Sequence, residues 1–233
     1  MKKTSDHQLS RRQLLQTGLT ATAAAFLTGG FDLTFPSLAH AQSTLTPSAA
    51  LTELMEGNKR FTSGRLTAHD QDLAILKQHT EEKQEPFAAV LSCADSRVPV
   101  ELVFDQSIGH IFVTRVAGNV ITPEIIGSLE FGAAVLGTKV ILVMGHSNCG
   151  AVKATIQGKD VPGQISSLFP HIQPGVDQGG TDLASATKAN AKVQATLLRE
   201  SSTVISGLVK SGSLKVTSGY YDLGTGSVTL LED

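Results

Sequence analysis

The chain has 233 residues, of which 41% are hydrophobic and 17% are charged, and its net charge is −2. These proportions suit one soluble globular domain of ordinary size, and the near-neutral charge gives no indication of nucleic-acid binding. Trp is absent and aromatic residues make up 5% of the chain, which argues against an aromatic-lined sugar site or base-stacking surface.

The N-terminal residues have the pattern of an export signal. Arg11 and Arg12 form a twin-arginine pair followed by leucines, and Ala39-His40-Ala41 has the small-x-small form of a cleavage site. A transmembrane helix is the alternative, but glycines interrupt the intervening uncharged stretch well short of the ~20 residues that a span needs. We predict that residues 1–41 are a twin-arginine signal peptide. The mature chain is then exported, to the periplasm of a bacterium or an equivalent compartment, without a stable membrane span. An uncleaved anchor is the alternative left open.

A helical arm is predicted before the first strand. Apolar residues from Pro47 to Ser63 recur at helical spacing, and a second short helix is predicted over residues 71–78. We treat residues 48–80 as an arm that could pack on a neighbouring subunit as easily as on its own.

Strands and helices then alternate along the chain. Strands are predicted at residues 87–91, 111–116, 139–144, 214–221 and 228–231. Helices are predicted at 98–104, from Thr122 to near Gly137, from Cys149 onward, and as one long amphipathic helix whose apolar face includes Ala186, Val193, Leu197, Val204 and Leu208; residues 158–180 are predicted to be a loop. The fold class is therefore α/β, with a mainly parallel central sheet, flanking helices, an antiparallel last strand and the N-terminal arm, in a single domain over residues 42–233.

Two short segments hold both cysteines of the chain. Cys93 follows one apolar run, and His146 and Cys149 follow another. Because the carboxyl ends of parallel strands share one edge of a sheet, where ligands bind, we expect these side chains to meet. Two thiolates and one imidazole suit zinc and leave a fourth position for water or a carboxylate, whereas Mg²⁺ and Ca²⁺ prefer oxygen. From spacing alone, a disulfide and two buried thiols stay open as alternatives.

Asp95 and Arg97 lie beside the first cysteine in the sequence. They could form a surface ion pair of little energetic value. Beside a metal they could form a gate: Asp95 either occupies the fourth metal position or pairs with Arg97, whose planar guanidinium suits a carboxylate, and leaves that position to water.

Longer stretches around these residues resemble the beta-class carbonic anhydrases. The stretches are Cys93-Ala94-Asp95-Ser96-Arg97, residues 109–119 with Arg115 and Gly118, residues 145–152 with His146 and Cys149, the helix segment 57–61, Ala189-Asn190, Leu198-Arg199, residues 219–222, and Thr225-Gly226. The resemblance covers most of the mature chain in the family's order, and the joint presence of the two cysteine motifs is highly specific.

The resemblance implies zinc-dependent, reversible hydration of carbon dioxide to bicarbonate and a proton, with one Zn²⁺ per chain. It matches the zinc ligands to Cys93, His146 and Cys149, the gate to Asp95 and Arg97, and a glutamine that binds substrate in one subgroup to Gln106. It also implies a homodimer or a higher multiple of dimers. It names no proton shuttle.

Two other functions remain as alternatives on the same scaffold. Relatives of the family hydrolyse carbonyl sulfide or carbon disulfide with the same site residues. A non-enzymatic exported zinc-binding protein would have a closed site in which Asp95 never leaves the metal; the presence of Arg97, which can draw Asp95 away, argues against it.

Overall fold

The computed structural model describes residues 43–68, 80–81 and 83–232. The predicted signal peptide and the predicted helix at 71–78 lie outside these residues. The described elements belong to one compact unit, residues 39–233. Within the described part of the chain, no helix is long and apolar enough to cross a membrane.

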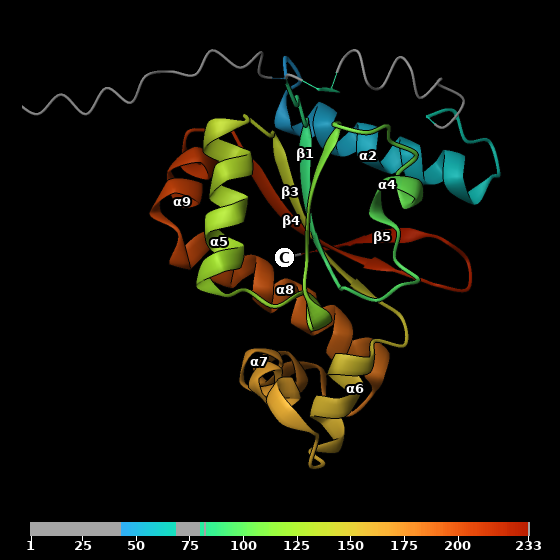
Figure 1. Cartoon of the computed structure of the whole chain (residues 1–233), viewed down its shortest axis with the longest axis vertical. Coiled ribbons are helices and arrows are strands. Elements are labelled where there is room, and N and C mark those ends of the chain that lie inside the picture. The colour runs from blue at the N-terminus through green and yellow to red at the C-terminus, as the bar shows by residue number, and fades with distance from the viewer. Residues whose placement is uncertain (1–42, 69–79, 82, 233) are drawn as a thin grey trace, which may run out of the picture. The chain divides into compact units, whose positions relative to one another are not determined.

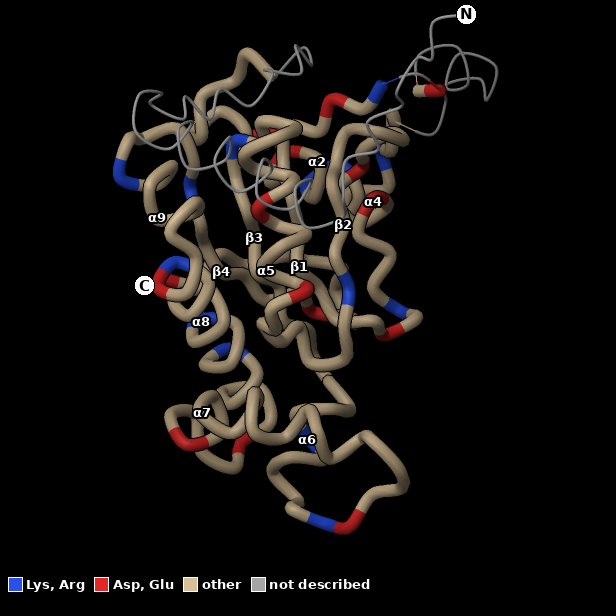
Figure 2. Tube along the Cα trace, turned by 60° about the vertical axis from the view of Figure 1, so that its left-hand side comes forward, with Lys and Arg blue, Asp and Glu red and all other residues tan. Residues whose placement is uncertain are grey.

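The described elements form a five-stranded sheet in the order β2-β1-β3-β4-β5. Its strands are β1 (Ala88–Ser92), β2 (Ile111–Arg115), β3 (Val140–His146), β4 (Lys215–Tyr221) and β5 (Val228–Leu231). The first four are parallel, and β5 runs antiparallel to β4. The central strands β1 and β3 carry no charged residue and are buried throughout, as strands covered on both faces must be (Figure 2). The predicted fold class is confirmed.

Helices cover the two faces of this sheet (Figure 1). One face packs Ala88 and Val90 of β1 against α2 (Pro47–Thr62) and α4 (Val100–Val103). The other packs Ala89 and Leu91 against α5 (Pro123–Glu130), α8 (Leu183–Ser201) and α9 (Thr203–Lys210). Successive strand side chains point to opposite faces, so each central strand contributes to both cores.

Helix α2 is tied to the sheet by one buried amide. Thr46 caps the helix by accepting from the Ala49 N–H, and Pro47 occupies the first turn. Further along, Asn58 Nδ2 donates to Val103 O (3.0 Å) and Gly226 O (2.9 Å), and its Oδ1 accepts from the Val228 N–H (2.8 Å). This part of the predicted helical arm therefore packs on its own subunit.

Residues 158–180 are not the loop that the prolines suggested. They contain the 3₁₀ helix η3 (Gly163–Leu168) and the helix α7 (Phe169–Gly179), which with α6 (Gly150–Gln157) lies beyond one end of the sheet (Figure 1). Helix α7 tolerates Pro170 in its first turn and includes Pro174. It is fixed by close packing on α8: a Cβ built on Gly175 would lie 2.5 Å from Asn190 Cα, and one on Gly179 2.5 Å from Ala186 Cα.

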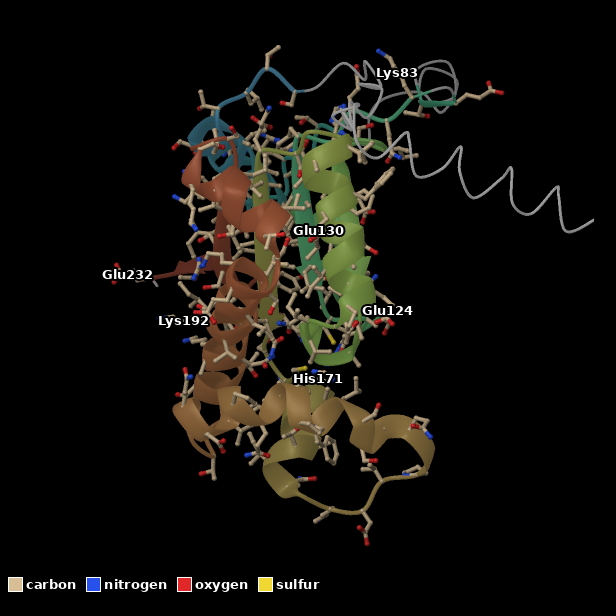
Figure 3. All side chains as sticks on the ribbon, turned by 90° about the vertical axis from the view of Figure 1, so that its left-hand side faces the viewer. Lys83, Glu124, Glu130, His171, Lys192 and Glu232 are labelled. Atoms are coloured by element: carbon tan, nitrogen blue, oxygen red, sulfur yellow. The ribbon has the colours of Figure 1, made fainter. Side chains whose placement is uncertain are left out.

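The long helix predicted after residue 180 is two helices, α8 and α9. They break at Ser202, whose hydroxyl caps α9 by accepting from the Ile205 N–H and donates to Glu130 Oε1 (2.6 Å). Glu130 is on α5 (Figure 3), so the break also joins two helices on one face of the sheet. The predicted apolar face was partly wrong, because Val193 and Leu197 are only half-buried and Val204 is exposed. The face that α8 buries is instead made of Ala186, Thr187, Asn190, Ala191, Gln194, Ala195 and Leu198.

Helix α5 (Pro123–Glu130) is followed directly by a π-helical segment. The π-helical segment η2 (Phe131–Val135) extends it to the turn at Gly137, which has a φ of 75°. The predicted end of this helix near Gly137 is therefore confirmed. The change from α-helix to π-helix over its last residues was not predicted.

Candidate metal centre

The two cysteine segments meet at the carboxyl edge of the sheet. Cys93 follows β1, His146 is the last residue of β3, and Cys149 is the N-cap of α6. Because β1 and β3 are adjacent and parallel, with Ser92 opposite Met144, their carboxyl ends lie together. The two sulfurs and a ring nitrogen of His146 lie within 4.8 Å of one another, and all three residues are buried. Neither cysteine is in a disulfide.

The imidazole of His146 is held by one of its two nitrogens. Nδ1 lies 2.9 Å from Ser147 O, a carbonyl that can only accept, so Nδ1 carries the proton and Nε2 presents a lone pair. Nε2 is buried and has no hydrogen-bond partner among the described residues. Ser147 is itself fixed by the β4–β5 hairpin: its N–H donates to Tyr221 O (2.9 Å), and its Oγ accepts from the Leu223 N–H (2.8 Å).

The closeness of the two thiols separates their pKa values. Hydrogen bonding with Cys149 lowers the pKa of the Cys93 thiol to about 4 against the effect of burial, with smaller contributions from His146 and the Gly118 N–H. The pKa of Cys149 is raised, because it hydrogen bonds to the Cys93 sulfur and is itself buried. Cys93 is therefore the more acidic of the two thiols. A divalent cation would favour both thiolates, and two sulfurs with one imidazole are a donor set that fits zinc.

Asp95 and Arg97 form a bidentate ion pair next to this cluster. Arg97 Nε donates to Asp95 Oδ1 (2.9 Å) and Nη2 to Oδ2 (2.8 Å), and the Arg97 backbone N–H also donates to Oδ1 (2.9 Å). The pKa of Asp95 is held well below its usual range, first by the hydrogen bonds from the Arg97 side chain. Asp95 Oδ2 lies 3.9 Å from His146 Nε2, so the carboxylate borders the cluster while it is paired with Arg97.

Arg115 has a position that sequence reasoning did not interpret. Its Nε donates to Cys93 O (3.1 Å) and its Nη2 to Asp95 O (2.5 Å). The end of β2 thus holds the backbone of the segment that carries both Cys93 and Asp95. The available signal was a basic residue at the end of the strand that neighbours β1, within a stretch already noted for its resemblance.

Gln106 hydrogen bonds to helix α2 in this structure. It follows α4, is buried, and donates from Nε2 to Glu53 Oε1 (3.2 Å) on α2. Among the described residues, no hydrogen bond joins Gln106 to Cys93, His146 or Cys149.

Comparisons with known proteins agree with this geometry. The model of the carbonic anhydrase family matches residues 88–228. Carbonic anhydrase 2 of Mycobacterium tuberculosis is 33% identical over 192 residues, which cover 79% of this chain and 92% of that protein.

Two solved structures share the fold. A Coccomyxa beta-carbonic anhydrase in complex with acetazolamide aligns with a TM-score of 0.60 at 26% identity, covering 78% of this chain and 86% of that one. Tetrameric beta-carbonic anhydrases from Sordaria macrospora align with a TM-score of 0.64 at 18% identity, covering 78% and 97%. From the family match, the similar relative and the shared fold, the chain belongs to the beta class of the carbonic anhydrase family.

Proposed function

We propose that this protein catalyses the reversible hydration of carbon dioxide to bicarbonate and a proton, with one zinc ion on Cys93, His146 and Cys149. The observation that carries the proposal is the convergence of two thiols and an unpartnered imidazole nitrogen at a buried point. Zinc at such a site supplies a hydroxide nucleophile near neutral pH, because it lowers the pKa of a coordinated water. The names of the similar proteins, all carbonic anhydrases, support the same reaction.

We assign Asp95 and Arg97 to the control of the fourth metal position. While Arg97 holds both carboxylate oxygens, Asp95 does not compete for that position. Its lowered pKa keeps it ionised at neutral pH, so it can accept a hydrogen bond from a substrate or water beside the cluster. Arg115 holds the backbone of Asp95 and so limits how far the carboxylate can turn.

The test is stopped-flow carbon dioxide hydration by the chain beginning at Gln42, with zinc measured on the same sample. We expect fast turnover at about one zinc per chain. Full zinc without turnover at any pH would refute carbon dioxide as the substrate and lead to assays with carbonyl sulfide and carbon disulfide. A sample without zinc and without free thiols would refute the metal site.

A variant pair separates the gate from general charge effects. Asp95→Asn keeps the size of the side chain but loses the charge that binds Arg97, and we expect it to retain zinc and lose most of its turnover. Asp160→Asn removes an exposed carboxylate from the α6–η3 connection and should leave turnover unchanged. Full activity of Asp95→Asn at every pH would show that the carboxylate has no role in the gate.

Gln106 is proposed as a substrate-binding residue from its match to the family. Its Nε2 carries two hydrogens, so it can donate one to a substrate while the other stays on Glu53 Oε1. Replacement of Gln106 by Leu should therefore raise KM with zinc content unchanged, and an unaltered KM would exclude the role.

We propose a homodimer or a higher multiple of dimers. The Sordaria macrospora proteins of the same fold are described as tetrameric. Strand β2 forms an edge of the described sheet, and near it Ile108 and Phe131 are 58% and 46% exposed. Light scattering should give a mass of at least two chains, and Phe131→Glu should reduce it. A monomer at micromolar concentration would refute the proposal.

We also propose that residues 1–41 are a twin-arginine signal that directs export, probed by Arg11 and Arg12. The support is the sequence pattern of that segment. Changing both arginines to Lys should abolish export of the full chain, and full export of that variant would refute the route.

A further inference from the structure

The backbone of Gly118 is held by hydrogen bonds at both its N–H and its carbonyl, next to the metal centre. Its N–H donates to Cys93 Sγ at 3.4 Å, and its carbonyl accepts from Asn190 Nδ2 at 2.9 Å. Its φ is 76°, in the left-handed region, and a Cβ built there would lie 2.7 Å from Ile172 Cδ1. Gly118 therefore brings its backbone closer to its neighbours than a residue with a side chain could.

The side chain of Asn190 is restrained by close packing and by hydrogen bonds. It is fully buried in the middle of α8, where the backbone of α7 passes so closely that a Cβ on Gly175 would lie 2.5 Å from Asn190 Cα. Its Oδ1 accepts from Gln194 Nε2 (3.2 Å). Gln194 also accepts from the Ile121 N–H (2.8 Å), so α8 holds the segment around Gly118 at two points.

A hydrogen bond to a metal-bound thiolate reduces the electron density that the sulfur donates to the metal. The N–H attracts electron density that the sulfur would otherwise donate, and groups of this kind beside metal ligands tune both affinity and metal acidity. Two thiolates formally neutralise a divalent ion, which makes its water ligand less acidic than at a site of three neutral imidazoles. An N–H on one of the sulfurs offsets part of that loss.

We propose that Asn190 is a positioning residue that holds the Gly118 N–H on Cys93 Sγ and so weakens the donation of that sulfur to the bound metal. The inference rests on the proposed metal site, and the two can fail separately. Asn190 is not one of the three converging donors, and it acts through the backbone of Gly118.

The test uses the chain loaded with Co²⁺, whose thiolate-to-metal charge-transfer absorption reports the electron density on sulfur. Asn190→Leu keeps the approximate size of the side chain and removes the donor, and Asn190→Ala removes both. In each variant, the absorption should shift to lower energy, because the sulfur regains the electron density that the N–H attracted. Zinc affinity measured against a competing chelator should nevertheless fall about tenfold or more, because the Cys93 thiolate loses the N–H that orients it and stabilises its charge.

Thr187→Val is the matched control. Thr187 is also buried on α8, one turn before Asn190, and its hydroxyl donates to Leu183 O (2.7 Å) within the helix. Losing that bond removes a buried polar group from the same helix without touching the Gly118 carbonyl. This variant should have the absorption energy and zinc affinity of the unmodified protein.

The outcomes separate the two proposals. An unmodified protein without a thiolate-to-Co²⁺ absorption would refute the proposed metal site itself. If that absorption is present but keeps its energy in folded Asn190 variants, the positioning role is wrong while the metal site stands. Failure of both Asn190 variants to fold with metal present, when Thr187→Val folds, would assign Asn190 to folding alone and overturn the inference.

Discussion

The contact between Gly118 and Ile172 gives a prediction whose magnitude follows from two separable causes. In Gly118→Ala, the backbone keeps its φ of 76°, which costs a residue with a Cβ about 1–2 kcal/mol. The new Cβ also meets Ile172 Cδ1 at 2.7 Å, and overpacking of this kind costs about 1–3 kcal/mol. We therefore expect a total loss of roughly 2–5 kcal/mol in the free energy of unfolding.

Removing the obstructing methyl group should relieve the second cause and leave the first. Ile172→Val deletes Cδ1 from a fully buried side chain and by itself should cost about 0.5–1.5 kcal/mol. In that background, Gly118→Ala should cost only the backbone part, about 1–2 kcal/mol. The remaining contacts of the new Cβ, at 3.3 Å from Ala151 Cβ and Ile172 Cγ1, need shifts of a few tenths of an ångström at most.

The assay is urea unfolding of the four proteins of this cycle, followed by far-ultraviolet circular dichroism at one fixed free-metal concentration. The prediction is a favourable coupling between the two substitutions, within the range of about 0.5–3 kcal/mol found for residues in contact. If Gly118→Ala costs the same in both backgrounds, the close approach of Ile172 does not limit residue 118, and the packing argument fails.

Three further substitutions test other parts of the structure. Arg115→Lys loses the fork that reaches two carbonyls and, since Arg115 is exposed, should cost only about 1 kcal/mol of unfolding free energy in urea titrations. Arg65→Lys, also on the surface, should change it by less than ~0.5 kcal/mol. Asp105→Asn should cost about 2–3 kcal/mol at pH 7, because the buried Asp105 carboxylate binds Arg60 Nε at 2.6 Å. Burial opposes ionisation of Asp105, but Arg60 and neighbouring donors lower its pKa. The stabilisation by the carboxylate is therefore present above ~pH 4 and disappears as the pH falls through the lowered pKa. The unfolding free energies of the unmodified protein and Asp105→Asn should converge at that low pH, and a difference that stays constant with pH would contradict the assignment. Cys149→Ser should bind far less than one zinc per chain by elemental analysis and lose stability with it, and full zinc retention would exclude Cys149 as a ligand.

The sheet and the cysteine cluster could be predicted because their determinants are local in the sequence. The continuous apolar runs of β1 and β3 are typical of central strands that are covered on both faces, and each run leads directly into the residues that converge. Helix α7 could not be predicted in the same way, because Pro170 and Pro174 are unfavourable signals for a helix. Its stability depends on contact with α8 through Gly175, which the sequence shows only as another glycine in a supposed loop.

The buried face of α8 illustrates a second limit of sequence reasoning. Hydrophobic periodicity selected the larger apolar residues Val193 and Leu197, but the closest packing requires small side chains, and polar ones are allowed where a partner exists. The partner of Asn190 is the Gly118 carbonyl, 72 positions away in the chain. A pattern within one helix cannot show that its polar residue satisfies a peptide bond in a distant turn.

Each donor of the candidate metal centre is restrained by a different part of the fold. The β4–β5 hairpin holds His146 through Ser147, and α8 holds the Gly118 peptide on Cys93. The start of α6 carries Cys149 as its N-cap. These restraints are contacts within the protein, and an ion bound by the three donors would add stability by mass action. Packing of α8 on the Gly118 backbone then influences the electron density on the Cys93 sulfur. Arg115, at the end of β2, influences the pairing of Asp95 with Arg97. Substitutions far from the metal should consequently change the metal affinity and the Asp95–Arg97 pairing independently of each other. Such independence is not expected if the bound ion alone held the site together.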